Sequence, residues 1–399
     1  MPPEAVVFYC DGQYADKYKD EVEKLKEHGI EVMVDEYEGA ARHDYLLFDD
    51  SSCRICQPPA QAGSEPSPGT VYWYRHKYTK QSARLIVYSH SIDDGPSDSS
   101  LPEGSFALHP YEWSFLKDTG EGVFMKDEKG RFLVSRSEKN IERVVMGMTH
   151  LAGVKPPKNL AEKEALKKEM AKKIGIDLNP DLPLILFSWA PLEADEVNRG
   201  LMELSKHANI IVKYYPHHPY LGHFDRVPDA SGPNIFYSTD HGLNAIMRLA
   251  ADINLASYIS SVFVSCVAHN LRTIPVCTHR MSSIIPKGVF AYSFYFNFLQ
   301  KAYARLARNI GPVNIAFTDK ILDRLHNEDY WREYHDKLPE IISNIFGNFI
   351  TGDEAAKLGA HHVMNVLQYG SFVTPDLKRK GTAFKGRANL NTAMLPIAL

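Results

Sequence analysis

One loop in the second half of the chain carries residue types that bind phosphate. Residues 213–219 read KYYPHHP and directly follow the short apolar run 210–212, which is typical of a buried strand. A loop at the carboxyl end of a parallel strand faces the ligand crevice of an α/β sheet, and an imidazole there can hydrogen-bond to a phosphate. We therefore predict that His218 contacts a phosphate, with Lys213 and His217 in supporting positions. The alternative is a turn whose histidines have no ligand.

A pair of serines forms the second candidate. Ser260 and Ser261 stand between the apolar run 252–255 and a helical pattern over 262–271. Serine hydroxyls and free backbone N–H groups at a helix N-terminus form a ready anion site. Serines also cap helices that have no ligand, so a purely structural interpretation of this pair stays open.

The first half of the chain offers one histidine that follows a strand. Residues 84–88 read RLIVY, which predicts a strand, and His90 comes next in a long polar stretch that runs to residue 100. A long polar loop after a strand is where an α/β sheet places chemistry. His90 is therefore a candidate functional residue, and a histidine that only structures its loop is the alternative.

Neither a metal nor a cofactor is predicted. His217, His218 and His223 lie close together in the sequence but lack the carboxylate or cysteine pattern of a zinc site. Cys53 and Cys56 have the spacing of a metal or redox pair, but no second pair lies nearby. We expect both cysteines to be loop or core residues.

Length and composition limit the class of protein that carries these residues. A chain of 399 residues suits two domains, and its 44% hydrophobic and 24% charged residues are ordinary for a globular protein. The net charge of −4 provides no basic field for nucleic acid. The N-terminus has no secretory pattern, no window offers the roughly 18 apolar residues of a membrane span, and the five cysteines suit a reducing compartment. We predict a cytoplasmic protein without nucleic-acid partners.

Strands and helices alternate in both halves, which predicts parallel sheets of the doubly wound α/β class. In the first half we expect a hairpin over 123–134, a helix over 141–148, and strands over 6–10, 30–34, 45–48 and 84–88. In the second half we expect helices over 160–173, 193–207, 242–250 and 262–271, and strands over 184–187, 210–213, 234–237, 252–255 and 274–276. Further helices are predicted over 290–308, 317–328, 335–347 and 353–369.

A proline-rich and lysine-rich segment over 153–159 marks a linker. The predicted organisation is an N-terminal Rossmann-like domain, a second domain that binds a donor, a helical segment that packs back on the first domain, and a basic tail. These parts are expected over 1–155, 156–285, 286–372 and 373–399.

The order of the second-half segments resembles the nucleotide-binding domain of the CDP-glycerol glycerophosphotransferase family, the teichoic-acid polymerases, and of related capsule-type GT-B glycosyltransferases. The family's lysine and His-Pro loop is similar to Lys213 and His218-Pro219, and its aspartate and serine pair to Asp252 and Ser260-Ser261. The loop at Ser188 is similar to the small polar loop after the family's first strand of this domain. The match covers residues 184–276 well and 84–155 poorly.

This resemblance implies two Rossmann-like domains that face a cleft, and a metal-independent transferase. The enzyme would move a glycosyl or glycerophosphoryl group from a nucleotide-activated donor to a hydroxyl of a glycan or glycolipid acceptor in polysaccharide biosynthesis. His90 would be the catalytic base, although the Gly-Thr that follows the family's histidine is absent. His218, Ser260 and Ser261 would hold the donor phosphates. The acid that the family carries on the following helix is also absent, so Ser265 becomes a further phosphate candidate.

Two other functions remain open at this stage. A sugar-nucleotide 2-epimerase has the same fold, but usually carries several acids around the sugar. A non-catalytic module of this fold would bind a glycan or a partner without turnover.

The aromatic segment 286–300 and the arginines after it could dock on the inner face of a membrane. We favour a core helix for this segment, and peripheral membrane contact is the alternative. The basic tail could assist such contact.

Overall fold

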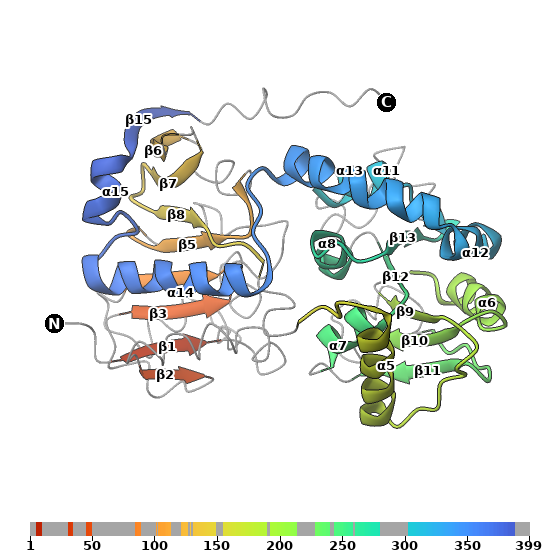
Figure 1. The fold of residues 1–399 in the computed structure, drawn as a ribbon. Helices are drawn as coiled ribbons and strands as arrows, with labels where there is room; N and C mark the ends of the chain where they lie inside the picture. The colour runs from red at the N-terminus through yellow and green to blue at the C-terminus, as the bar shows by residue number, and fades with distance from the viewer. Residues whose placement is uncertain are drawn as a thin grey trace, which may run out of the picture. The chain divides into compact units, whose positions relative to one another are not determined.

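The computed structural model describes part of the chain and divides it into two compact units. Unit 1 comprises residues 1–153 and 346–399, and unit 2 comprises residues 154–345 (Figure 1). The described residues are 5–9, 31–34, 45–49, 84–88, 101, 103–112, 121–126, 128, 131–148, 155–189, 192–213, 228–239, 243–257, 260–279 and 302–387.

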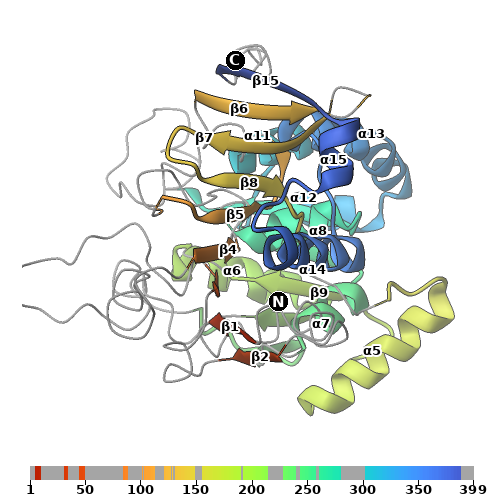
Figure 2. The same cartoon turned by 90° about the vertical axis from the view of Figure 1, so that its left-hand side faces the viewer.

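Unit 1 is built on a sheet to which nine strands of the described chain contribute. The order is β2-β1-β3-β4-β5-β8-β7-β6-β15, in which the first six strands are parallel and the last three pairings are antiparallel (Figure 2). The parallel part has the strand order of flavodoxin-like sheets. The strands are β1 (Ala5–Tyr9), β2 (Glu31–Val34), β3 (Tyr45–Asp49), β4 (Arg84–Tyr88), β5 (Phe106–His109), β6 (Glu121–Lys126), β7 (Phe132–Ser137), β8 (Glu142–Val145) and β15 (Thr382–Arg387).

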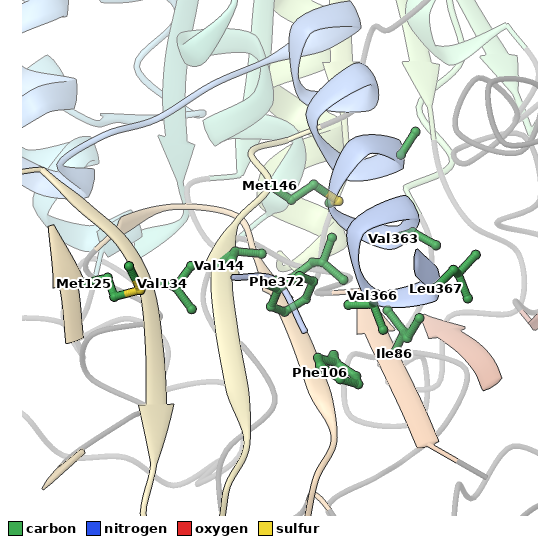
Figure 3. Packing of buried hydrophobic residues seen from close by; sticks show 12 residues of the cluster. Ile86, Phe106, Met125, Val134, Val144, Met146, Val363, Val366, Leu367 and Phe372 are labelled. Atoms are coloured by element: carbon green, nitrogen blue, oxygen red, sulfur yellow. The ribbon is translucent and has the colours of Figure 1, made fainter. Parts of the chain in front are cut away.

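Helix α14 (Gly352–Tyr369) covers the middle of this sheet. Its residues Val363 and Val366 pack in one cluster with Ile86 of β4, Phe106 of β5 and the following Phe372 (Figure 3). The rings of Phe106 and Phe372 meet edge to face, with centroids 5.3 Å apart. Sequence-distant ends of the chain therefore share one hydrophobic core.

Unit 2 is built on a sheet whose six strands, among the described residues, are all parallel. The order is β11-β10-β9-β12-β13-β14, which is the Rossmann order 3-2-1-4-5-6. Each of β9, β10, β12 and β13 is buried throughout, as the continuous apolar runs of the sequence predict. The strands are β9 (Leu184–Ser188), β10 (Asn209–Lys213), β11 (Ile235–Ser238), β12 (Ile253–Ser257), β13 (Thr273–Cys277) and β14 (Val313–Asn314).

Helices α5 to α8 connect and cover this sheet. Asn159 caps the charged helix α5 by accepting a hydrogen bond from the Glu162 backbone N–H, and Gly175 ends it in the left-handed conformation. Helix α5 packs its few apolar residues against α7, β9 and β10. The helices are α5 (Leu160–Ile174), α6 (Ala194–Leu204), α7 (Asn244–Ala250) and α8 (Ser261–Ala268).

The predicted fold class, α/β with two Rossmann-like domains and C-terminal helices, is confirmed. The predicted helix over 141–148 is wrong, because this segment forms β8. Its apolar residues recur at helical spacing, but all four residues of β8 are buried between β5 and β7. Pairing with two strands here overrides the local pattern.

The predicted C-terminal organisation needs two corrections. Three of the C-terminal helices belong to unit 2: α11 (Ala302–Ile310), α12 (Thr318–His326) and nearly all of α13 (Glu328–Phe346). The predicted packing of residues 286–372 on the first domain is therefore correct only from residue 346 onward. The part of the predicted basic tail that the structure describes, up to residue 387, forms α15 (Pro375–Lys380) and β15.

Helix α11 also bears on the segment that was considered for membrane contact. Leu306, Ala307 and Ile310 are buried, as expected of a core helix, whereas the aromatic segment 286–300 lies outside the described residues. Among the residues that the structure describes, no helix is long and apolar enough to cross a bilayer.

Asp252 ties α5 to the amino edge of the second sheet. Its carboxylate accepts hydrogen bonds from the Leu184 backbone N–H at 2.8 Å and from Lys167 at 2.8 Å, and it pairs with Lys163 at 2.9 Å. Burial by itself would raise the pKa of Asp252, but these partners outweigh burial and the pKa is lowered.

We expect Asp252→Asn to reduce the free energy of unfolding at neutral pH by about 1–3 kcal/mol, because the substitution removes the charged partner of two lysines. A lowered pKa contributes stability above the ordinary value of 3.8 and loses it as the pH falls through the folded-state value. In urea titrations the difference between the two proteins should therefore begin to shrink near pH 3.8 and should vanish only below the lowered folded-state pKa of Asp252. Glu169→Gln, which breaks an exposed ion pair with Lys173 on the same helix, should change stability by less than about 0.5 kcal/mol. A constant difference across the pH range would contradict this assignment.

Candidate functional site

The carboxyl edge of the second sheet gathers polar side chains. Ser188 ends β9 and lies next to Lys213, which ends β10, and Lys213 in turn lies next to Ser238, which ends β11. On the other side of β9, β12 ends at Ser257, one residue beyond the partner of Ser188. All four side chains are buried. A buried lysine among hydroxyls at this edge is suited to an anion.

The strand order changes direction at this edge. The chain runs from β9 outward through β10 and β11, and then returns to the other side of β9 to continue through β12 and β13. In open α/β sheets, ligands bind outside the carboxyl ends of the strands at such a switch point. Ser188 and Ser257 flank that point, so the topology of this unit independently selects the region that the sequence motifs indicate.

Helix α8 begins directly at the switch point. Ser260 is its N-cap, and the Ser260 hydroxyl accepts a hydrogen bond from the Val262 backbone N–H at 3.2 Å. The Ser260 backbone N–H donates to the Ser257 carbonyl at 2.9 Å, which holds the short turn between β12 and α8. The N–H groups of the first helical turn and the positive end of the helix dipole favour an anion at this position.

The Ser257 hydroxyl is a further polar group at the start of α8. Its Oγ is fully buried and has no hydrogen-bond partner within the described part of the chain. A buried hydroxyl without a partner costs free energy, and functional sites are where such groups are commonly found. Sequence analysis did not select Ser257, because only the register of β12 shows that it ends the strand beside Ser188.

Ser265 lies one turn into α8 and is fully buried. Its hydroxyl accepts a hydrogen bond from Arg248 at 3.2 Å, and Arg248 comes from the last turn of α7. The guanidinium of Arg248 is itself buried, and no carboxylate pairs with it among the described residues. Ser265 thus orients a buried cation that sequence analysis missed, because an isolated arginine in a helical pattern reads as a surface residue.

Acidic side chains of α6 reach the same edge beside β13. Glu193 accepts a hydrogen bond from the Thr278 hydroxyl, and Glu196 accepts from the His279 backbone N–H at 2.9 Å. Burial, together with the charges of Glu196 and Glu193, raises the pKa of the neighbouring Cys277 to about 11, so its thiol stays protonated at neutral pH. The two acids fix the segment that leaves β13.

Several predicted residues are not described by the structure. His90, His217 and His218 lie outside the described residues, and for Ser261 only the backbone position at the start of α8 is described. Asp252, the aspartate of the sequence motif, lies at the amino edge of the sheet, at the end of β12 opposite to Ser257, and has the structural role given above. Within the described residues, no group of three or more histidine, cysteine or acidic side chains is arranged to hold a metal ion.

Comparison with known proteins identifies similar solved structures but no family. No protein-family model matches the chain, and no curated protein sequence matches it. A structure of the wall teichoic acid polymerase TagF soaked with CDPG is similar over 92% of this chain and 89% of its own, with 13% identity and a TM-score of 0.48.

Two enzymes with other activities are also similar. The spinosyn forosaminyltransferase SpnP aligns over 92% of this chain and 99% of its own with 10% identity and a TM-score of 0.45. A UDP-N-acetylglucosamine 2-epimerase aligns over 93% and 97%, with 10% identity and a TM-score of 0.42. These structures include the group that the sequence motifs resemble. At this level of similarity the function has to be argued from the chain's own residues.

Proposed function

We propose that this protein is a transferase that takes a glycosyl or glycerophosphoryl group from a nucleotide-activated donor and passes it to a hydroxyl of a glycan or glycolipid acceptor. The observation that carries the proposal is the N-terminus of α8 at the switch point of a Rossmann-ordered sheet, where Ser260 caps the helix and β9, β10 and β12 end in Ser188, Lys213 and Ser257. The likeness to TagF and SpnP agrees with this direction but adds no evidence on the substrate.

Each residue has a distinct role in this scheme. The donor's phosphates lie against the first turn of α8, where backbone N–H groups and the Ser260 hydroxyl face them. The buried Lys213 at the end of β10 supplies positive charge at this edge of the sheet, which would stabilise the phosphate that leaves. His218, in the loop that follows Lys213, is proposed to contact the same phosphates.

The chemical step needs a base on the acceptor. His90 is proposed to accept the proton of the acceptor hydroxyl as its oxygen attacks the transferred group and the bond to the nucleotide phosphate breaks. The nucleotide then leaves with the electron pair of that bond. Positioning and charge stabilisation carry this reaction, and no metal ion is included in the scheme. We place the protein in the cytoplasm, where nucleotide donors are made.

We expect one of CMP, CDP, UDP, GDP and ADP to stabilise the purified protein by about 2.7 kcal/mol at a hundredfold excess over its Kd, since the nucleotide binds only the folded state. Thermal melts and calorimetry measure this effect, and the base that binds names the donor class. His90→Asn should retain nucleotide binding and lose transfer by at least about a hundredfold, because only the proton acceptor is removed.

The outcomes separate the transferase from its alternatives. Binding with nucleotide-sugar epimerisation in the absence of an acceptor would indicate the epimerase. Binding without turnover would indicate a non-catalytic module. If none of the nucleotides stabilises the protein, the anion site at α8 has no donor and the proposal fails.

A further inference from the structure

The end of β12 carries a hydroxyl group to which the proposed reaction scheme gives no role. The Oγ of Ser257 is fully buried, and it forms no hydrogen bond within the described part of the chain. A hydroxyl in this state has given up its bonds to water without gaining others, so a ligand that supplied a partner would stabilise it. The neighbours of Ser257 indicate what kind of ligand this would be.

The direction of the side chains along β12 shows which face of the sheet Ser257 shares. Successive side chains along a strand point to opposite faces. The Asn254 side chain donates to the Arg248 carbonyl in the last turn of α7, and the Arg248 guanidinium donates to Ser265 of α8. Asn254 therefore faces α7 and α8, and Ser257, an odd number of residues further on, faces the opposite side.

Helix α6 brings two carboxylates to that opposite side. Ser257 is paired with Val276 of β13, and Thr278, two residues beyond Val276, shares this face. Glu193 at the start of α6 accepts a hydrogen bond from the Thr278 hydroxyl, and Glu196 accepts from the backbone N–H of the next residue. Strand spacing and rise separate Ser257 from Thr278 by about 8 Å, a gap that a sugar ring or a glycerol chain spans with a hydrogen bond at either end.

The charge on the α6 side is negative. Glu193 is the N-cap of α6, and Asp195 and Glu196 lie in its first turn, so three acids oppose the positive end of this helix dipole. Arg199 on the next turn is exposed, and within the described residues it forms no ion pair with Glu196. The start of α8 has no acid in its first turn and offers backbone N–H groups. The edge therefore suits an anion at α8 and hydrogen-bond donors at α6.

We propose that the α6 side of this edge recognises hydroxyl groups of the donor, with Glu193 and Glu196 as acceptors and the Ser257 hydroxyl as a further partner. This inference rests on the proposed transferase and identifies the residues that read the uncharged part of its donor. The carboxylates would repel a phosphate, and an apolar group would leave Ser257 without a partner. Neighbouring hydroxyls satisfy both requirements, because a hydroxyl donates to a carboxylate and also exchanges a hydrogen bond with a serine.

Hydroxyls of this kind occur both in the ribose of a nucleotide and in a transferred glycosyl or glycerol group. Calorimetric titration of the full-length protein distinguishes the two sources. For each base, the ligands are the ribonucleoside diphosphate, its 2′,3′-dideoxy form, and the diphosphate esters of a sugar and of glycerol. Loss of affinity for the ribonucleotide but not for its dideoxy form identifies the ribose, and loss for an ester alone identifies the transferred group.

Glu196→Gln and Ser257→Ala should each weaken binding of the hydroxyl-bearing ligand by at least about tenfold, because each removes one hydrogen-bond partner in a buried setting. Glu203→Gln is the matched control, since it makes the same substitution at an exposed residue near the end of α6. This variant should bind every ligand as the parent protein does.

Several results would overturn the proposal. These are unchanged binding of every ligand by both variants, an equal loss in Glu203→Gln, and an equal loss for the dideoxy form and all other ligands. Tighter binding by Glu196→Gln would show that this carboxylate only repels the phosphate.

Thermal melts check that each variant is folded. Ser257→Ala removes a hydroxyl that has no partner, so it should melt at or above the parent temperature and supplies the test if Glu196→Gln is unstable. If no nucleotide binds the parent protein, the proposed function fails and this inference fails with it. If the parent and both variants bind equally well, only this inference fails.

Discussion

The Ser260→Asp protein is expected to unfold at the same or a higher urea concentration than the parent protein, while it loses at least about a hundredfold in nucleotide affinity. Aspartate is as good an N-cap as serine, and a negative charge at the start of a helix interacts favourably with the dipole. The backbone N–H of Val262, which donates to the Ser260 hydroxyl in the parent protein, would donate to the aspartate carboxylate in the variant. A phosphate at the same place would instead be repelled by the negative charge of the aspartate. This repulsion costs several kcal/mol of binding free energy, and each 1.4 kcal/mol lowers the affinity tenfold.

Unchanged or higher stability together with weaker nucleotide binding is a result that only an anion site at this position would give. Ser260→Asn is the matched control, because asparagine caps the helix equally well and carries no charge. It should bind the nucleotide within a few-fold of the parent protein in calorimetric titration. If Ser260→Asp and Ser260→Asn bind equally, the phosphates do not lie at the start of α8. If Ser260→Asp unfolds much earlier than the parent, the capping geometry described above is wrong.

Gly200→Ala is expected to lower the free energy of unfolding by about 2–4 kcal/mol. Alanine normally stabilises the interior of a helix by about 0.5–1 kcal/mol relative to glycine, so the expected sign is reversed. The reason is the close approach of α6 to the chain that leaves β14. A Cβ on Gly200 would lie 2.4 Å from the Ile315 carbonyl oxygen and 2.9 Å from the Ile315 side chain. A backbone atom cannot move aside as the end of a flexible side chain can, so α6 itself must shift.

Urea unfolding of Gly200→Ala and of the neighbouring Arg199→Ala measures this effect. Arg199 is exposed on the same helix, and its substitution should change stability by less than about 0.5 kcal/mol. A shift of α6 would also displace Glu193 and Glu196 from Thr278 and His279, so nucleotide affinity should fall in Gly200→Ala as well. A stabilised Gly200→Ala protein would show that α6 does not approach Ile315 in solution.

The alternation of apolar runs and helical patterns was sufficient to predict the α/β class and most elements of the second unit. Buried parallel strands such as β9 and β10 are continuous apolar runs, and a helix such as α5 is bounded by a capping asparagine and a terminal glycine. These signals are local, so they can be read without knowing which elements become neighbours. The same holds for Ser260, whose capping position follows from the boundary between β12 and α8.

What the sequence could not determine depends on contacts between distant residues. The segment 142–145 has helical periodicity and becomes a strand because β5 and β7 are available on both sides. The basic residues after Pro375 carry no periodicity and become α15 and an edge strand because β6 offers an unpaired edge. Ser257 acquires its place beside Ser188 only through strand register, and Arg248 contacts Ser265 only through the packing of α7 against α8. Local propensity therefore determined most of the elements, whereas tertiary pairing determined β8 and β15 and decided which side chains meet.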